Sequence, residues 1–491
     1  MPMDMTAGAA QADDPAPQFD STLERIVQTR QRNAEMRQAV RHDIERPPGP
    51  KKREVWRAVM RGEVPSVEFL SRFTQYRPMA YVRMPRGDLY FLNDPDLIWE
   101  VFVTADVVKG FGLQMARAIV GDGILTSEGD KHRSRRAMVQ PAFTGRQIAG
   151  YGEDMMAAIR DADERWSAQY DAGDSLVMLL DDMTKLTLDI VGRTLFGLDL
   201  AVVSGELGPD LAAAFAVFNT TLNPKWELLS RYPSGPRRHL TESVDRMDSV
   251  VGGIIRDKRA ALAAGAVETD MMSTLIQATD PETGLGLSDN EVRDEAMTLL
   301  LAGHETTTML LSWTWLFLFS HPQWKDWVAQ EWDETEELSL AAVSQMPRTR
   351  AVLAESLRLR PPAWVTDRIT VEDTIVGDFV IPRGESIVAS QYMMHRDDRY
   401  WNDSEEFRPD RWIDDNGAYT EKIVPRGVYF PFGFAARKCI GDRFALAEAA
   451  LSLAYLGRRW HVIPLDPSAV EPRPSVTLRP STNLPARLRR R

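Results

Sequence analysis

The most apolar stretch of the sequence, MTLLLAGHETTTMLLSWTWLFLFS (residues 297–320), decides the expected fold. It is long enough to span a bilayer, which takes about 20 residues, but the polar HETTT segment at its midpoint would be costly in lipid. A helix that is apolar on almost every face is more often the central helix of a large globular core. Ser288 and Glu291 match a capping box just before this stretch. We therefore predict one buried helix of about thirty residues, well above the usual length, with a functional site at its polar midpoint.

Strand signals lie on both sides of this helix in the sequence. MAYVRM (79–84) and DLYFLN (88–93) indicate two strands joined by a turn over residues 85–87. The segment DTIVGDFVIPRGESIVAS (373–390) is rich in β-branched residues and punctuated by glycines. Because we expect the early and late strands to meet, and most of the remaining chain has helical periodicity, we predict a mainly α fold with a smaller β-rich portion. Length alone suggests about three domains, but this arrangement favours a single domain over residues 51–491, after a polar, partly disordered extension over residues 1–50.

The composition excludes several classes of protein. The 491 residues carry a net charge of −12, which argues against nonspecific nucleic-acid binding because such binding needs a basic footprint. The single cysteine excludes an intrachain disulfide framework and a cysteine-rich zinc module, and it is compatible with a reducing compartment. Residues 1–20 resemble neither a secretory signal nor a membrane anchor. These features predict a cytoplasmic protein.

The single cysteine, Cys439, lies between an aromatic, glycine-containing loop and a helical period that begins at Gly441. A helix N-terminus favours a thiolate over a thiol, and Arg437 and Lys438 act in the same direction. Two other interpretations stay open from the local context. Cys439 could be a buried small hydrophobe, or a protease nucleophile, which would need a histidine base that the sequence does not indicate.

The loop PFGFAARKCIG (431–441) resembles the haem-binding loop of the cytochrome P-450 family, whose pattern is F-x-x-G-x-R-x-C-x-G. Phe432, Arg437, Cys439 and Gly441 match this pattern, whereas Ala435 stands where the family usually has glycine. The resemblance implies that Cys439 is the axial thiolate ligand of a haem b iron and pushes electron density toward O–O cleavage. It also implies that the backbone at Gly441 packs close under the haem. Because a Cβ must be accommodated at Ala435, we expect the loop to be slightly reshaped there.

Three further motifs of the same family occur in the expected order. AGHETT (302–307), at the midpoint of the long helix, is similar to the family's oxygen-activating segment. The resemblance implies that Ala302 and Gly303 let haem and ligand approach the helix. It also implies that Glu305 and Thr306 form an acid–alcohol pair that delivers protons to bound O2. Taken alone, such a stretch would more often be threonines whose hydroxyls bond back to i−4 carbonyls.

The remaining two motifs imply structural and haem-contacting roles. Glu355 and Arg358 in AESLRLRPP, with Arg411 in FRPDRW, resemble the family's buried E-x-x-R network, although an i,i+3 pair is usually a surface ion pair. GDKHRSRRAMVQPAF (129–143) is similar to the helix that contacts the haem propionates. This similarity implies propionate contacts for His132 and Arg136, with Arg368 as a further contact. The plainer interpretation of His132 and Arg136 is a solvated basic face.

The resemblance places a substrate pocket between the AGHETT helix, the loop after Val108, the segment near residues 215–218, residues 363–367 and residues 481–484. The apolar residues at these places are Phe111, Leu113, Phe215, Phe218, Leu299, Ala302, Ala363, Trp364 and Val365. They predict an apolar ligand, although each of them could be ordinary core. We favour a fatty acid or another lipid-like molecule over a terpenoid or an aromatic compound.

The resemblance predicts a haem-thiolate monooxygenase, which hydroxylates or epoxidises its substrate with one oxygen atom of O2 and reduces the other atom to water. One alternative is a peroxygenase that uses H2O2, but an enzyme that recruits a substrate carboxylate would not need the Glu305–Thr306 pair. Another alternative is a non-enzymatic haem binder or gas sensor, but no output domain is recognisable.

No reductase motif follows the Cys439 region, so we expect electrons from NAD(P)H through a separate ferredoxin or flavodoxin and its reductase. The segments that flank the thiolate side of the haem in this family would form the docking patch for such an acidic protein. Their basic residues are Lys131, Arg133, Arg135, Arg437, Lys438 and Arg443. A solvated basic face is the plainer interpretation. We expect a monomer without a membrane span.

Overall fold

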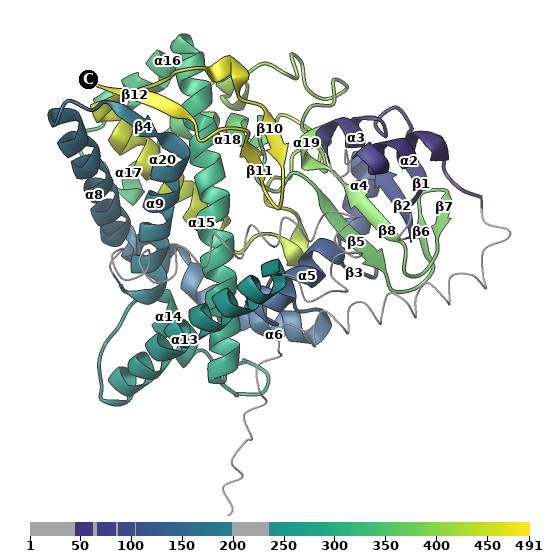
Figure 1. The fold of residues 1–491 in the computed structure, drawn as a ribbon, viewed down its shortest axis with the longest axis horizontal. Coiled ribbons are helices and arrows are strands. Elements are labelled where there is room, and N and C mark those ends of the chain that lie inside the picture. The colour runs from purple at the N-terminus through teal and green to yellow at the C-terminus, as the bar shows by residue number, and fades with distance from the viewer. Residues whose placement is uncertain (1–44, 62–65, 85–86, 104, 199–234) are drawn as a thin grey trace, which may run out of the picture.

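The long apolar stretch forms one helix, α15 (Asp289–Ser320), in the middle of the computed structural model, which describes residues 45–61, 66–84, 87–103, 105–198 and 235–491 (Figure 1). The helix has 32 residues, and the predicted capping box is present at its start. Ser288 Oγ accepts the N–H of Glu291, while the Glu291 carboxylate accepts the N–H of Ser288. Most side chains of α15 are buried, including Trp313 and Trp315. The prediction of one long buried helix is confirmed.

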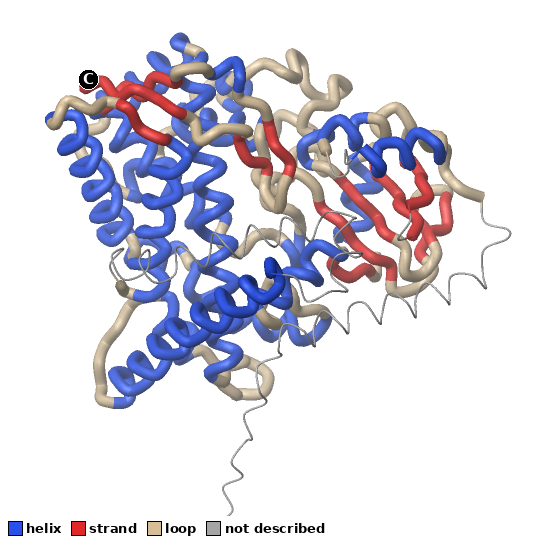
Figure 2. Tube along the Cα trace, viewed as in Figure 1, coloured by secondary structure: helices blue, strands red, loops and turns tan. Residues whose placement is uncertain are grey.

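Helices surround α15 and form the larger part of the molecule (Figure 2). These helices are α5 (Phe111–Val120), α6 (Gly129–Val139), α7 (Gly145–Gly150), α8 (Gly152–Asp171), α9 (Leu179–Val191), α13 (Gly235–Ala263), α14 (Met271–Gln277), α16 (Pro322–Glu334), α17 (Leu340–Ser344), α18 (Pro347–Leu359) and α20 (Asp442–Arg459). α5, α9, α13, α18 and α20 contact α15 directly. One continuous apolar core joins these helices, so α15 is held on most of its faces.

The main sheet lies beside the helical part, on the right of Figure 2, and has the order β1-β2-β8-β5-β3. Its strands are β1 (Met79–Met84), β2 (Gly87–Leu92), β3 (Val107–Lys109), β5 (Thr366–Thr370) and β8 (Ser386–Ala389). β2 and β8 are parallel, with Leu89 opposite Ser386, and the other neighbours are antiparallel. Early and late strands therefore meet in one sheet, as the sequence predicts.

Shorter elements complete this β-rich part. They are α2 (Lys52–Arg61), α3 (Val67–Ser71), α4 (Pro95–Val103), α19 (Gln391–Met394) and the hairpin of β6 (Thr374–Val376) with β7 (Phe379–Ile381). A second apolar core lies between α2, α3 and the sheet. Pro48 accepts the N–H of Tyr81 through its carbonyl at 3.0 Å, so the segment before α2 is seated on β1.

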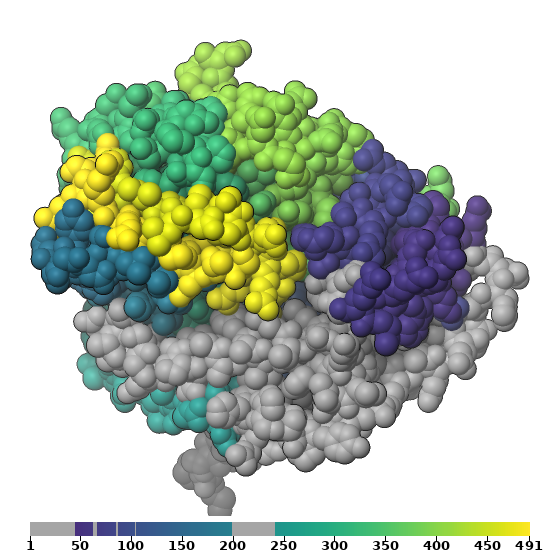
Figure 3. Space-filling view, turned by 45° about the horizontal axis from the view of Figure 1, so that its top comes forward, coloured from purple at the N-terminus to yellow at the C-terminus, as the bar shows by residue number. Residues whose placement is uncertain are grey.

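Two small sheets come from the C-terminal part of the chain. β12 (Pro485–Arg490) lies between β4 (Leu176–Met178) and β9 (Trp460–Pro464). β10 (Pro472–Pro474) pairs with β11 (Leu478–Pro480) in a hairpin, and β11 contacts α15. In Figure 3, this C-terminal segment (yellow) lies on the surface between the helical part and the purple N-terminal elements. The hairpin thus lies at the surface and also contacts the central helix.

The fold is mainly α with small β sheets, as the sequence predicts. Within the described part of the chain, no helix is both long and apolar enough to cross a bilayer. Residues 1–44 of the expected N-terminal extension lie outside the described residues. The single domain over residues 51–491 stays a prediction.

Candidate active site

One face of α15 is open at the middle of the helix. Leu299, Ala302, Gly303 and Thr306 are half-buried or exposed, whereas the residues between and around them are buried. Their spacing of i, i+3, i+4 and i+7 puts them on one side of the helix, and we call them the open stripe. Gly303 also faces α9, where an added Cβ would meet Val191 Cγ2 at 3.3 Å. An accessible space therefore lies along the helix midpoint.

The threonines after Gly303 bond back to the helix. Thr306 Oγ1 donates to the Ala302 carbonyl at 2.7 Å, and Thr307 and Thr308 make the corresponding bonds at 3.0 and 2.8 Å. The plainer interpretation, in which the threonine hydroxyls bond back to i−4 carbonyls, is therefore seen in the structure. Of the three, Thr306 lies on the open stripe, and its hydroxyl oxygen can still accept a hydrogen bond there.

Glu305 does not share the open stripe with Thr306. Its side chain is buried against the β10–β11 hairpin, where Oε1 accepts a hydrogen bond from Thr477 Oγ1 at 2.8 Å. The same oxygen lies 3.1 Å from Arg479 Nη1. The acid and the alcohol are thus neighbours in sequence that face different surroundings.

The loop before α20 is fixed at both of its ends. The N–H of Cys439 donates to the Phe432 carbonyl at 2.8 Å and closes the loop. Near its start, the N–H of Phe430 donates to His395 Nε2 at 3.0 Å. Near its end, Arg136 of α6 donates to the carbonyl of the residue before Cys439 at 2.8 Å. The sulfur is therefore presented by a loop that one internal bond closes and that two other segments hold.

Ala435 keeps a backbone conformation that favours glycine. Its φ is +45°, in the left-handed region, although the residue has a Cβ. Such a conformation costs about 1–2 kcal/mol in a residue other than glycine. The backbone at Ala435 therefore accepts this strain, and the expectation that the loop is slightly reshaped there stays a prediction.

The Cys439 thiol is exposed, yet protein atoms surround it closely enough to change its acidity. Burial raises the pKa of the Cys439 thiol above its ordinary value, and the N–H of Gly441 and the charges of Arg136 and Lys438 only partly oppose this. The nearby cations thus favour the thiolate, as the sequence predicts, but burial outweighs them. A metal ion coordinated by the sulfur would deprotonate it outright.

Buried cations gather beside this loop. Lys109 and Arg368 are cross-strand partners on β3 and β5, and their exposed fractions are only 6% and 8%. Burial and the charge of Arg437 lower the pKa of Lys109 to about 7. Burial lowers the pKa of Arg368 as well. Two cations side by side in a desolvated place are costly unless an anion compensates them.

The same cluster includes α6 and the Cys439 loop. Burial, with the charges of Arg437, Lys109 and Arg136, lowers the pKa of His132 to about 3, so its imidazole is neutral. Arg437 donates to the Ser127 carbonyl at 3.0 Å and pairs with Glu128. Glu128 is the carboxylate that opposes Lys109 and Arg437 most directly, and Asp367 opposes Arg368. The described part of this cluster carries more positive than negative charge, which favours an anionic ligand.

Glu355 and Arg358 of α18 form a buried ion pair with complete hydrogen bonding. Arg358 Nε and Nη2 donate to the Glu355 carboxylate, each at 2.8 Å. Arg411 Nε and Trp412 Nε1 also reach that carboxylate, at 3.2 and 2.9 Å. The remaining N–H groups of Arg358 bond backbone carbonyls, including that of His395. Because His395 also accepts the N–H of Phe430, the network is joined to the Cys439 loop.

The segments expected to line a substrate pocket lie on neighbouring elements. α5 contacts both α15 and β5. Phe111 and Leu113 on α5, Leu299 on α15 and Val365 before β5 are half-buried, and Ala363 is exposed. These residues can therefore face a common apolar space.

Trp364 is a correction to the predicted pocket. Its side chain is only 2% exposed, belongs to the core of the β-rich part and donates from Nε1 to the Ser475 carbonyl at 3.0 Å. The core interpretation therefore holds for this residue. Phe215 and Phe218 lie outside the described residues.

The predicted basic docking patch is smaller than expected. Arg135 is buried and pairs with Glu291 and Glu295 of α15, because its side chain points to the helix instead of the solvent. Lys131, Arg133 and Lys438 each pair with a nearby aspartate. An open groove of about 470 Å³ lies here, lined by Arg133, Arg136, Arg437, Ala436 and part of α6.

Comparison with known proteins agrees with this geometry. The chain is an oxidoreductase of the monooxygenase class, as its family and the named relatives below show. The cytochrome P450 family model matches residues 47–485, and the chain belongs to this family.

The relatives found include two proteins of Streptomyces melanosporofaciens. Cyclooctatin synthase is 33% identical over 84% of this chain and 89% of its own length. Cyclooctat-9-en-7-ol 5-monooxygenase is 33% identical over 81% of this chain and 85% of its own length. Pentalenene oxygenase of Streptomyces avermitilis is 28% identical over 82% of this chain and 88% of its own length.

The residues present fit a haem group, which this family implies. The exposed Cys439 sulfur is a suitable iron ligand, and the excess of buried cations suits the carboxylates that haem carries. At Gly441, φ is −94° and an added Cβ would meet Phe143 Cε1 only at an ordinary 3.5 Å. The described protein atoms would therefore tolerate a side chain at position 441. A haem packed against the backbone there would instead require glycine.

Sequence reasoning missed Lys109, Thr477 and Arg479. The cross-strand partner of Arg368 could have been sought once β3 and β5 were paired, but the three-residue β3 gives a weak strand signal. Thr477 lies 172 residues from Glu305 in the chain, and nothing in the local pattern connects them.

Proposed function

We propose that this monooxygenase inserts one oxygen atom of O2 into a C–H or C=C bond of an apolar small molecule, with Cys439 as the axial ligand of haem b. The observation that carries the proposal is the exposed sulfur of the chain's single cysteine, held in a fixed loop beside buried cations that outnumber the carboxylates around them. A lone cysteine offers no pair of thiols for covalent attachment, which supports haem b.

Haem, when bound, supplies the redox-active iron at which O2 is reduced and activated. Cys439 Sγ would hold the iron, and Lys109, His132, Arg136, Arg368 and Arg437 would hold the carboxylates. Phe432 and Gly441 would shape the surface against which the group packs. Glu355, Arg358 and Arg411 would keep the loop in place from behind.

The open stripe would manage the protons of the reaction. Ala302 leaves space beside the helix, and Thr306 would hold a hydroxyl at the face where oxygen is reduced. Glu305 would resupply protons from the other side of the helix. With Thr306→Ala, we expect NAD(P)H consumption to continue while product falls and peroxide rises. Unchanged coupling would rule out this role for Thr306.

The carbon monoxide difference spectrum of the reduced protein tests the ligand assignment. We expect the absorption that marks a thiolate ligand in the wild type, and its loss in Cys439→Ala and Cys439→His. A wild-type protein that holds haem without this absorption would overturn the assignment of Cys439.

We propose that electrons come from NAD(P)H through a ferredoxin or flavodoxin that docks at the groove beside Arg133, Arg136 and Arg437. Exposed Arg443 and Lys438 extend the positive surface there, whereas Arg135 takes no part. Charge-guided docking predicts a reduction rate that falls with rising salt. A rate that does not change with salt would count against this surface.

For the substrate, the apolar side chains of α5 and the open stripe support an apolar ligand. The relatives carry names that include cyclooctat-9-en-7-ol and pentalenene, so we propose a terpenoid-type alkene or alkenol over a fatty acid. Titration with both classes, monitored by the low-to-high spin shift, tests this. A spin shift with fatty acids alone would reverse the preference.

A peroxygenase on the same scaffold is less well supported. The relatives are named as a monooxygenase and an oxygenase, and the chain retains the Glu305–Thr306 pair. Product formation that requires H2O2, and that fails with O2 and a reducing system, would favour the peroxygenase.

A further inference from the structure

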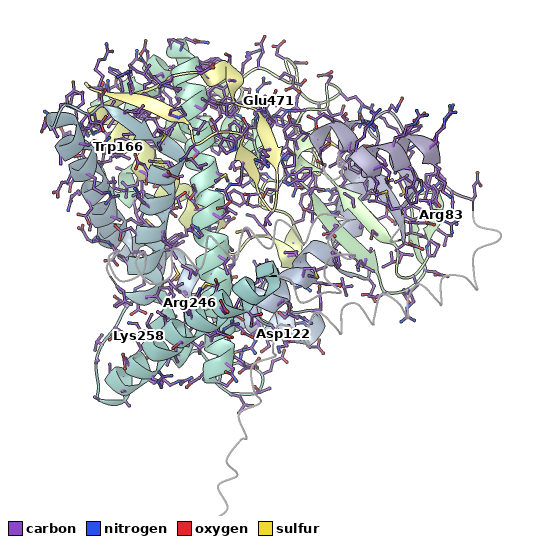
Figure 4. The ribbon with its side chains drawn as sticks, viewed as in Figure 1. Arg83, Asp122, Trp166, Arg246, Lys258 and Glu471 are labelled. Carbon is purple, nitrogen blue, oxygen red and sulfur yellow. The ribbon has the colours of Figure 1, made fainter. Side chains whose placement is uncertain are left out.

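The C-terminal hairpin brings two polar side chains to the buried Glu305 carboxylate. Thr477 Oγ1 donates to Oε1 at 2.8 Å, and Arg479 Nη1 lies 3.1 Å from the same oxygen. Glu305 and Thr477 are buried, whereas about a third of the Arg479 side chain is exposed, at 32%. Figure 4 marks this region by Glu471, just before β10. A buried carboxylate is therefore paired with a cation that also reaches water.

The hairpin is held in place by bonds that do not involve this ion pair. Trp313 of α15 donates from Nε1 to the Leu478 carbonyl at 2.8 Å. The N–H of Leu478 donates to the Pro362 carbonyl at 3.0 Å, and Trp364 Nε1 donates to the Ser475 carbonyl at 3.0 Å. Removing the Arg479 guanidinium should therefore leave the backbone of β11 where it is.

Few other charged groups face Glu305 in the described part of the chain. His304 precedes it on α15 and shares a hydrogen bond between Nδ1 and the Leu300 carbonyl at 3.0 Å. Burial lowers the pKa of His304, so its imidazole is neutral. Arg473 stands directly opposite Arg479 in the β10–β11 register and is exposed. Because directly opposed residues share one face of a hairpin, Arg473 adds positive charge near the pair without contacting Glu305.

We propose that Thr477 and Arg479 are positioning residues of a proton relay that runs from solvent at Arg479, through Glu305, to the Thr306 face of α15. This inference rests on the proposed function and extends it. Water at the exposed end of Arg479 gives a proton to the Glu305 carboxylate. The resulting carboxyl O–H turns to the Thr306 side and gives its proton to the Thr306 hydroxyl oxygen, which passes a proton on to the oxygen that is being reduced. The carboxylate then returns to Thr477 and Arg479, so one proton has moved inward and no electron has been transferred.

Arg479→Gln, with Arg473→Gln as the matched control, tests this assignment. The first readout needs no turnover: an infrared pH titration of the protein, in which the Glu305 carboxyl band is assigned by subtracting the Glu305→Gln spectrum. Removing a cation beside a carboxylate favours the protonated form. We therefore expect a stronger Glu305 carboxyl band at a given pH in Arg479→Gln than in the wild type. Arg473→Gln should titrate as the wild type does, and Arg479→Lys should restore most of the effect.

The second readout is the ratio of product to peroxide in the haem-loaded enzyme, with a substrate found by the spin-shift titration. We expect this ratio to fall about tenfold in Arg479→Gln, less than the roughly 100-fold cost of losing a proton donor outright because Glu305 itself is retained, and to stay unchanged in Arg473→Gln. Thr477→Val should lower it in the same direction.

Wild-type behaviour of Arg479→Gln in both readouts would overturn the relay, as would an equal effect of Arg473→Gln. If Thr306→Ala uncouples the reaction but Arg479→Gln does not, only the relay fails. If neither Thr306→Ala nor Cys439→Ala changes the reaction, the proposed function itself fails.

Discussion

The Cys439 loop requires a left-handed backbone conformation at Ala435, which an alanine adopts less easily than a glycine. Its φ of +45° is one that glycine adopts freely. The side chain is exposed, so no packing explains the alanine. The strain is therefore local to the loop that presents the sulfur.

Replacing this residue tests the strain directly. Ala435→Gly removes a cost of about 1–2 kcal/mol in the folded loop and adds about 0.4–1 kcal/mol of chain entropy to the unfolded state. We expect a net gain in unfolding free energy of between about 0 and 1.6 kcal/mol, measured by chemical denaturation. Ala436→Gly is the matched control, since Ala436 is exposed in the same loop without a positive φ, and it should destabilise the protein. A loss of stability in Ala435→Gly would contradict this account.

Lys109 is a second residue whose unfavourable environment indicates a missing ligand. Burial destabilises the charged form of this ammonium group and lowers its pKa to about 7. An anionic ligand beside it would stabilise the charged form. We expect Lys109→Met to weaken haem retention about tenfold, as the loss of one hydrogen bond to a charged group implies, measured as haem transfer to an acceptor protein. Lys131→Met, which removes an exposed and already paired cation, should leave retention unchanged. Equal retention in both variants would contradict the role of Lys109.

At the scale of elements, the loop between α5 and α6 is bound to α15 by carboxylates. The N–H of Asp122, labelled in Figure 4, donates to Asp294 Oδ2 at 2.7 Å. The N–H of Ile124 donates to Glu295 Oε2 at 2.9 Å, and Arg135 reaches Glu295 from α6. α6, which carries His132 and Arg136, thus takes its position from α15.

Glu295 makes this joint sensitive to pH. Burial raises the pKa of Glu295 to about 7 from 4.5, so the folded protein holds a proton that the unfolded chain releases. This contribution to stability is complete below about pH 4.5 and is lost as the pH rises to about 7, by up to about 3 kcal/mol. In Glu295→Gln, we expect the fall in unfolding free energy between pH 5 and 7.5 to be smaller than in the wild type. Asp294→Asn should weaken the dependence in part, because the charge of Asp294 also raises the pKa of Glu295, and an unchanged slope in Glu295→Gln would contradict the assignment.

At the scale of the whole molecule, the Glu355–Arg358 pair ties α18 to the segment that leads into the Cys439 loop. Arg358→Met leaves the Glu355 carboxylate buried without its main partner, which costs about 3–5 kcal/mol. Calorimetric or denaturant unfolding should show this loss. Glu355→Leu combined with Arg358→Met should recover part of it, since no lone charge is then buried. If the double variant is less stable than Arg358→Met alone, the lone charge is not the cause.

Much of the architecture follows from local patterns. The long helix, its capping box and the strands near residues 79–92 depend on neighbouring residues, so the sequence predicts them well. The motif residues also come together as the family resemblance implies, with Glu355, Arg358 and Arg411 in one network.

The sequence could not predict which distant element each of these side chains contacts. Arg135 and Arg136 are adjacent, yet one is buried on α15 and the other reaches the Cys439 loop. Trp364 is as apolar as a pocket residue, but its indole N–H finds Ser475 in the core. Glu305 turns to a hairpin 172 residues away. Each outcome depends on which distant element supplies a partner, and no local period encodes that choice.

The order of strands in the main sheet has a consequence for synthesis of the chain on the ribosome. β2 pairs with β8, and the N–H of Asp88 donates to Glu385 across 297 residues. At about 5–20 residues per second, translation needs about 15–60 s to deliver the second strand after the first. For that time the edge of β2 has no native neighbour, and nascent β1 and β2 are open to wrong pairing with other chains. Yield in a heterologous host should therefore depend on chaperone supply and on growth temperature more than the stability of the finished enzyme suggests.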